Sequence, residues 1–321
     1  MTLHPIEIRE ISRRDLNIRS FTYCGGYYLD RNQINLTSEF LRLARIFLYN
    51  AGFTEIITPH LTKATGACEN IDTMFKVPFF NSSAYLAQTG QLYLETLVGN
   101  YEKVWCIGPS FRAENVVDKR HLCEFMLLEL EHLGDFEMLL KYIEELLSYC
   151  FGGFGFPREK FARITYSKAI ETLLNNGFKV SWGDDLSSEM EKFLVGNVPL
   201  FITHYPKDIK FFNMRVNPED PSIVNSADLI LPGVGEAVGS AEREYLYSNL
   251  LNRLKSSSMY KRLIEKGGSF KDFEWYINHY KDKGNLHSGC GIGINRIIQY
   301  LGNYESILET CSYPITTVSL F

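Results

Sequence analysis

Three short clusters of arginine, glycine and acidic residues are the parts of this sequence best suited to chemistry. The first begins with Arg112 and Glu114 and continues through Arg120 and His121 to Phe125. An arginine and an acid two residues apart lie on one face of a strand, and arginine suits bidentate contact with a phosphate group. An ordinary strand pair with a surface ion pair would give the same pattern, so this cluster alone does not define a site.

The second cluster is the glycine-rich run 289–293, which is followed by Asn295 and Arg296. Glycines at alternate positions let another group approach the backbone closely. The run predicts that a helix opens at Ile294 and continues to Leu301, with Arg296 near its start. A dinucleotide-binding fingerprint is excluded, because no strand–GxGxxG–helix unit with a distal acid is present.

The third cluster places two acids, Asp228 and Glu236, on either side of a turn that contains Gly233 and Gly235. Two carboxylates on neighbouring strand segments could share a magnesium ion that bridges the phosphates of ATP. A solvated turn with an acid at each end is the alternative.

Hydrophobic periodicity indicates the elements that must position these clusters. Apolar residues recur at helical spacing over 37–51, Gly52 ends that helix, and 53–58 is expected to form a strand stopped by Pro59. Asp135 is a suitable N-cap for a helix reaching Cys150, and a further helix follows Thr165. Because strands outnumber simple βαβ alternation, we expect an α+β fold with a mostly antiparallel sheet flanked by helices. The expected strands are around 21–29 and at 85–88, 104–107, 228–231 and 236–238, with extended arms at 111–112 and 125–131 joined by the loop 113–121.

The order of the three clusters resembles the signature motifs of class II aminoacyl-tRNA synthetases, and most closely those of the asparaginyl-tRNA synthetase catalytic domain. Residues 47–59 are similar to motif 1, residues 111–125 to motif 2 and residues 287–296 to motif 3. The resemblance runs from about Thr37 to about Leu301, and three further matching segments are 88–95, 182–186 and 205–210.

This resemblance implies an ATP site and a reaction that forms an acyl-adenylate. Arg112 would hold the α-phosphate and act in catalysis together with Arg296. Arg296 would also sandwich the adenine ring against Phe125. By the same likeness, Glu114 would contact adenine or its ribose edge, and His121 would lie near the outer phosphates. Arg120 would also bind ATP, as would Glu236, which would carry Mg²⁺ together with Asp228.

For the amino acid, the resemblance implies contacts to Glu69, Gln91, Glu95 and Arg243. Arg243 beside Glu95 suits a side-chain amide, because a bare carboxylate near Glu95 would be repelled. Aspartate bound in reverse, with its β-carboxylate facing ATP, would satisfy the same pair, so both orientations remain open. A surface helix acid is a third interpretation of Glu95.

The chain departs from the family pattern in several places. Family members carry an N-terminal OB-fold barrel that reads the anticodon, and about 36 residues before the motif 1 helix cannot form one. We therefore expect one catalytic domain over 1–321. Asn70, Asn295 and the run Asn278–Tyr280 replace family residues near the active site.

These features favour an AMP-forming ligase that activates aspartate, asparagine or a close analogue and transfers it to ammonia or another small amine. Transfer to tRNA or to a protein side chain is the alternative, with tRNA the less favoured partner, and a non-catalytic amino-acid sensor is a third interpretation.

The net charge of −5 does not require a nucleic-acid partner. Seven scattered cysteines without a CxxC pair, no signal core and no long apolar run favour a cytoplasmic protein without a membrane span. The motif 1 helix suggests a homodimer.

Overall fold

The fold is centred on an eight-stranded sheet in the computed structural model, which describes residues 22–24, 27–29, 31–63, 71–115, 118–157, 160–282 and 284–320. Only the two edge pairs, β3 with β7 and β10 with β9, are parallel. The described architecture confirms the expected α+β fold with a mostly antiparallel sheet. In spatial order the strands are β3 (Thr54–Glu55), β7 (Lys103–Phe111), β8 (Glu124–Leu133), β13 (His287–Gly293), β12 (Gly235–Glu242), β11 (Ser226–Leu231), β10 (Leu200–Thr203) and β9 (Ala162–Thr165).

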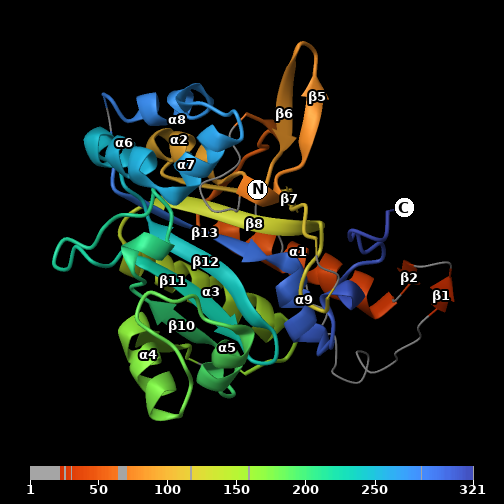
Figure 1. Ribbon diagram of the computed structural model, residues 1–321. Coiled ribbons are helices and arrows are strands. Elements are labelled where there is room, and N and C mark those ends of the chain that lie inside the picture. The colour runs from red at the N-terminus through yellow and green to blue at the C-terminus, as the bar shows by residue number, and fades with distance from the viewer. Residues whose placement is uncertain are drawn as a thin grey trace, which may run out of the picture.

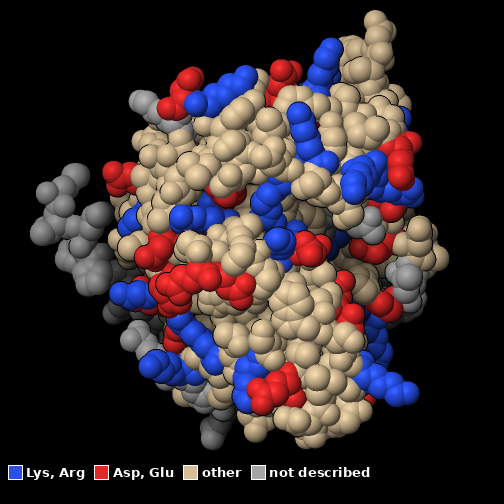
Figure 2. Space-filling model, turned by 60° about the vertical axis from the view of Figure 1, so that its left-hand side comes forward, with Lys and Arg blue, Asp and Glu red and all other residues tan. Residues whose placement is uncertain are grey.

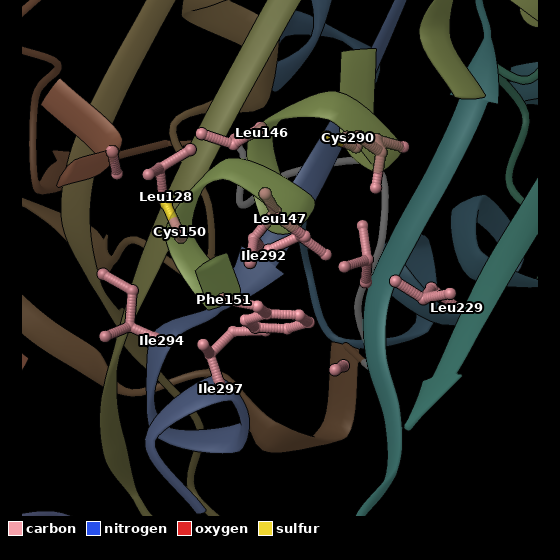
Figure 3. Close-up of a cluster of buried hydrophobic side chains, with 14 of the residues drawn as sticks. Leu128, Leu146, Leu147, Cys150, Phe151, Leu229, Cys290, Ile292, Ile294 and Ile297 are labelled. Atoms are coloured by element: carbon pink, nitrogen blue, oxygen red, sulfur yellow. The ribbon is translucent and has the colours of Figure 1, made fainter. Parts of the chain in front are cut away.

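One face of this sheet packs against three helices, α1 (Arg31–Asn50), α3 (Phe136–Gly153) and α9 (Ile294–Gly302) (Figure 1). Their apolar side chains share one core with inward residues of β8, β11, β12 and β13 (Figure 3). The side chain of Asp135 caps α3 by accepting a hydrogen bond from the Met138 amide, as predicted. This packing fixes β8 and β13, the two strands that carry motif 2 and motif 3 residues.

The remaining elements form two smaller clusters at opposite ends of the sheet (Figure 1). Helices α4 (Tyr166–Asn175) and α5 (Ser188–Val195) pack beside β9 and β10. At the other end lie α2 (Gln91–Tyr101), α6 (Tyr247–Ser256), α7 (Ser258–Glu265) and α8 (Glu274–His279). The smaller elements are β1 (Thr22–Cys24), β2 (Tyr27–Leu29), β4 (Leu61–Thr62), β5 (Lys76–Phe79), β6 (Ser82–Leu86), η1 (Ile71–Thr73), η2 (Lys207–Ile209), η3 (Phe270–Asp272) and η4 (Ile307–Thr310).

Three local expectations need correction. The first helix begins at Arg31, before the predicted 37–51 span, and the strand expected over 53–58 shrinks to β3 at the edge of the sheet. Arg112 and Glu114 do not share one face of a strand, because β7 ends at Phe111. The helix predicted to open at Ile294 is confirmed as α9, and the glycine run before it forms most of β13.

Glycine in β13 has a packing reason. A Cβ at Gly289 would lie 2.0 Å from the carboxyl carbon of Glu131, its pairing partner on β8. The alternating glycines therefore let buried side chains of β8 lie directly over the neighbouring strand, as the close-approach argument predicts. Across the described residues, no helix combines the length and the apolar character that a membrane span requires.

Candidate active site

A cavity of about 380 Å³ opens on the sheet between the two end clusters. Figure 2 shows a hollow on the face drawn there, with both basic and acidic side chains at its edge. The cavity is lined from β8, β11, β12, β13, the start of α9 and the segment between β7 and β8. The sequence-predicted residues in its lining are Gln91, Arg112, Glu114, Arg120, His121, Phe125, Asp228, Glu236, Arg243 and Arg296.

The two arginines given catalytic roles reach this cavity from different elements. The guanidinium carbon of Arg112 lies 4.9 Å from the centroid of the Phe125 ring, so Arg112 rather than Arg296 covers that ring in this structure. Arg296 donates from Nη1 to the carbonyl of Val234 at 3.1 Å and from Nη2 to the carbonyl of Arg120 at 3.0 Å. Arg296 thereby ties α9 to the turn before β12 and to the motif 2 loop.

Two further motif 2 side chains, those of Arg120 and His121, pair with acidic residues. The Nη2 atom of Arg120 lies 3.2 Å from Oε2 of Glu191 on α5. His121, which is exposed, pairs through Nδ1 with Asp118 at 2.8 Å. Glu191 carries no motif signal in the sequence, and only the packing of α5 beside β11 and β12 brings it here.

The two predicted metal ligands converge above the backbone of β12. A Cβ at Gly239 would lie 3.4 Å from Glu236 Oε1 and 3.9 Å from Asp228 Oδ1. The negative charge of Asp228, followed by burial, raises the pKa of Glu236 to about 7. Lys210, which sequence reasoning left without a role, pairs through Nζ with Asp228 Oδ2 at 2.6 Å. Within the described part of the chain, no group of three or more His, Cys, Asp or Glu side chains is arranged as a metal site.

At the opposite end of the cavity, Glu95 is at the centre of a buried network and does not line the cavity. Its Oε1 accepts hydrogen bonds from Gln91 Nε2 at 2.6 Å and from Asn213 Nδ2 at 2.7 Å. Its Oε2 accepts from the hydroxyls of Tyr276 and Tyr280. The interpretation of Glu95 as a surface helix acid is therefore wrong, since its side chain is 0% exposed.

Arg243 separates Glu95 from the cavity. Its Nε lies 3.6 Å from Glu95 Oε1, and its Nη2 lies 2.7 Å from Glu131 Oε1. Burial raises the pKa of Glu131 to about 7, although the charge of Arg243 opposes that shift. Burial would also raise the pKa of Glu95, but hydrogen bonding to His287 and the charge of Arg243 lower it overall. These buried charges hold one another in place.

Two further cavity residues, Thr89 and Glu129, were not predicted as site residues from the sequence. Glu129 accepts hydrogen bonds from the Thr89 hydroxyl and, at 2.7 Å, from the Gly90 amide. Burial raises the pKa of its carboxyl group. The only signal in the sequence was the alternation of Glu129 and Glu131 with apolar residues along β8.

The residues that depart from the family pattern have distinct positions. Asn295 lines the cavity, accepts from the Met126 amide at 3.1 Å and donates to the Thr310 hydroxyl at 3.0 Å. Asn278 lies in the last turn of α8, two residues before Tyr280, which lies in the network around Glu95. Glu69 and Asn70 lie outside the described residues.

Comparison with known proteins agrees with this geometry. The family described as tRNA synthetases class II (D, K and N) matches residues 30–317. This chain belongs to that family. It contains a class II catalytic domain of the kind that uses ATP to form aminoacyl-adenylates.

Among individual relatives, the asparagine–tRNA ligase of Pyrococcus furiosus is 38% identical over 300 residues, which are 87% of this chain and 67% of the relative. The asparaginyl-tRNA synthetase from Pyrococcus horikoshii complexed with asparaginyl-adenylate superposes with a TM-score of 0.82 at 35% identity, covering 90% of this chain and 69% of that one. The Entamoeba histolytica asparaginyl-tRNA synthetase in complex with asparaginyl-adenylate gives 0.81 at 29% identity, covering 90% and 68%.

Proposed function

We propose that this domain activates asparagine with ATP and transfers the asparaginyl group to tRNA. The proposal rests on a cavity that is lined by arginines at one end and, at the other, by Arg243 paired with Glu131. The chain is also similar to an asparaginyl-tRNA synthetase solved with asparaginyl-adenylate. The relatives named as tRNA ligases favour tRNA as the acceptor over ammonia or another small amine, the acceptor favoured by sequence alone.

In the proposed reaction, an oxygen of the asparagine α-carboxylate bonds to the α-phosphorus of ATP, and the bond to the bridging oxygen breaks to release pyrophosphate. Arg112 offsets the charge that accumulates on the phosphorus oxygens during this step. Phe125 offers a ring face for adenine, and Arg120 and His121 lie toward the outer phosphates. No side-chain nucleophile is required, because position and charge supply the catalysis.

The residues present fit a magnesium ion. Mg²⁺ is commonly bound by one or two carboxylates together with substrate phosphates, and Asp228 and Glu236 converge above Gly239 as such a pair. When bound there, Mg²⁺ would supply positive charge to the phosphates of ATP. Lys210 would then share Asp228 with the metal ion.

The charges at the amino-acid end favour an amide substrate over a carboxylate. Arg243 carries one positive charge, but Glu131 and Glu95 lie 2.7 and 3.6 Å from its nitrogen atoms. A second carboxylate from an aspartate side chain would therefore meet a cation that is already neutralised. An amide can still accept a hydrogen bond from Arg243 without adding charge. The charges around Arg243 therefore favour asparagine over aspartate for a substrate whose side chain faces this end of the cavity.

Pyrophosphate exchange tests this function. The full chain should exchange pyrophosphate with asparagine and ATP, with aspartate far less effective. Release of AMP should then rise when tRNA is added, and remain unchanged with ammonium chloride or hydroxylamine. Absence of exchange with asparagine would exclude the proposed activation. If ammonia but not tRNA raised the release of AMP, the acceptor would be a small amine.

We also propose a homodimer. The apolar face of α1 packs inside the chain on α3 and α9, so it does not by itself support an interface. Large apolar side chains around motif 1 remain exposed, however, including Ile57 at 96% and Tyr49 at 80%. Burying such side chains in a two-fold interface would remove them from water. Sedimentation equilibrium that shows only monomer at micromolar concentration would contradict the dimer.

A further inference from the structure

The ion pair between Arg120 and Glu191 joins the wall of the cavity to a helix behind it. Arg120 lines the cavity, whereas Glu191 does not. The Arg120 side chain is 32% exposed and that of Glu191 is 10% exposed, with 3.2 Å between Nη2 and Oε2. A carboxylate behind the cavity wall can hold an arginine without occupying the space where a ligand would bind.

The turn between β11 and β12 leaves room for this pair. A Cβ at Gly235 would lie 2.8 Å from Glu191 Oε2 and 2.9 Å from Arg120 Nη2. Gly235 also has a φ of +98°, a conformation that other residues rarely adopt. The backbone at Gly235 therefore lies so close to Glu191 and Arg120 that any side chain at position 235 would clash with their charged groups.

Glu191 is itself well anchored. Its amide donates to the Ser187 carbonyl at 2.9 Å, and the Ser187 hydroxyl caps the start of α5 by accepting from the Met190 amide. Burial raises the pKa of Glu191, and the charge of Arg120 opposes that shift. The Glu191 carboxylate thus projects from a short helix whose first turn is capped.

Arg120 needs such a partner because another arginine lies beside it. Arg296 Nη2 donates to the Arg120 carbonyl at 3.0 Å, and burial together with the charge of Arg120 lowers the pKa of Arg296. Both guanidinium groups also lie near Gly235, because a Cβ there would be 2.9 Å from Arg120 Nη2 and 3.6 Å from Arg296 Nη1, and like charges at this separation repel each other. Glu191 supplies a negative charge from the side away from the cavity.

We propose that Glu191 is a positioning residue for ATP, which holds the Arg120 guanidinium at the nucleotide end of the cavity before ATP arrives. The inference rests on the proposed contact between Arg120 and ATP. Without the Glu191 carboxylate, repulsion from Arg296 would displace the Arg120 side chain, and ATP would have to order it on binding.

The test compares Glu191→Gln with Glu189→Gln in the full chain. Glu189 lies on the same helix and its loss changes the net charge equally, but its side chain is exposed. Calorimetry with ATP and Mg²⁺, in the absence of amino acid, should show roughly tenfold weaker binding for Glu191→Gln and no change for Glu189→Gln. In pyrophosphate exchange the KM for ATP should rise equally, while kcat and the KM for asparagine stay within about twofold.

A double-mutant cycle with Arg120→Ala separates the possible outcomes. Arg120→Ala should weaken ATP binding, and Glu191→Gln should have no further effect in that background. Unchanged ATP affinity in Glu191→Gln, or an equal loss with and without Arg120, would overturn the inference while leaving the Arg120 contact intact. Unchanged affinity in Arg120→Ala would instead remove the proposed contact. Should Glu191→Gln fail to fold, Glu191→Asp replaces it, and its shorter side chain should give a smaller loss of affinity.

Discussion

At the nucleotide end of the cavity, Arg112, Arg120 and Arg296 present partly exposed guanidinium groups, whereas at the amino-acid end the Arg243 side chain is only 3% exposed. The nucleotide end faces open space that a triphosphate would fill. The amino-acid end is already balanced by the buried carboxylates of Glu95 and Glu131. Replacing Arg112 at the first end should therefore alter activity and leave stability nearly intact, while replacing Arg243 at the second should alter both.

The largest expected effect on activity is that of Arg112→Ala. Removing a charge that acts on the transition state should lower kcat for asparagine-dependent exchange by roughly 10²–10³-fold. The urea midpoint should change little, because Arg112 is partly exposed to the cavity. Arg163→Ala is the control, since that arginine pairs with Glu137 at the surface. Exchange reduced less than tenfold would refute the role given to Arg112.

Arg243→Met should lose asparagine activation and stability together. The substitution leaves Glu95 and Glu131 buried without their cation, and breaking a buried ion pair in this way costs about 3–5 kcal/mol. The double variant Arg243→Met with Glu131→Gln restores the charge balance, so urea unfolding should show that much of the stability returns. Exchange with asparagine should remain lost in both variants. If the single variant Arg243→Met unfolded at the same urea concentration as the wild type, the expected difference in stability between the two ends would be wrong.

The two ends of the cavity also differ in how far their residues could be predicted from the sequence. Arg112, Glu114, Arg120 and Phe125 lie within one short stretch of chain, so their shared position follows from the motif itself. The mostly antiparallel α+β fold likewise followed from the number of short strands. The roles given to individual residues by resemblance remain predictions.

The remaining features depend on packing between distant segments. Glu131 reaches Arg243 only because β8 pairs with β13 opposite Gly289, which has no side chain. Glu191 reaches Arg120 only through the placement of α5. Tyr276 and Tyr280 surround Glu95 from α8 and its end, which places Glu95 behind the cavity wall rather than in it. Such contacts involve registers and helix positions that local periodicity does not contain.

A smaller effect is expected from Gly235→Ala, with Gly233→Ala as its matched control in the same turn. Both glycines have positive φ, so either substitution should cost about 1–2 kcal/mol of stability. Only at Gly235 would the added Cβ meet Glu191 and Arg120, because a Cβ at Gly233 has nothing within 4 Å. The KM for ATP should therefore rise several-fold in Gly235→Ala alone. Equal KM values in the two variants would mean that the crowding has no functional consequence.

The smallest effect on turnover at a single pH is expected from Glu131→Gln, whose main consequence is a change in the pH dependence of stability. Burial raises the pKa of Glu131 from its ordinary 4.5 to about 7 in the folded chain. The folded state therefore retains a proton that the unfolded state releases between these values. The contribution of Glu131 to the free energy of unfolding should accordingly be greatest below about pH 4.5 and fall as the pH rises to about 7, by an amount on the order of a few kcal/mol.

Glu131→Gln removes this titration, so its free energy of unfolding should fall less than that of the wild type between pH 5 and pH 8. Urea unfolding of both proteins at unit steps of pH measures the difference. His287, whose pKa is raised by hydrogen bonding to Glu95 against the effect of burial, contributes a decrease of the same sign in both proteins. Because the charge of Glu131 is among the causes that raise the pKa of His287, the difference between the two curves reports Glu131 together with this coupling. Parallel curves would mean that Glu131 is ionised in the folded chain throughout this range, so that Arg243 and protonated His287 face two full negative charges at the amino-acid end.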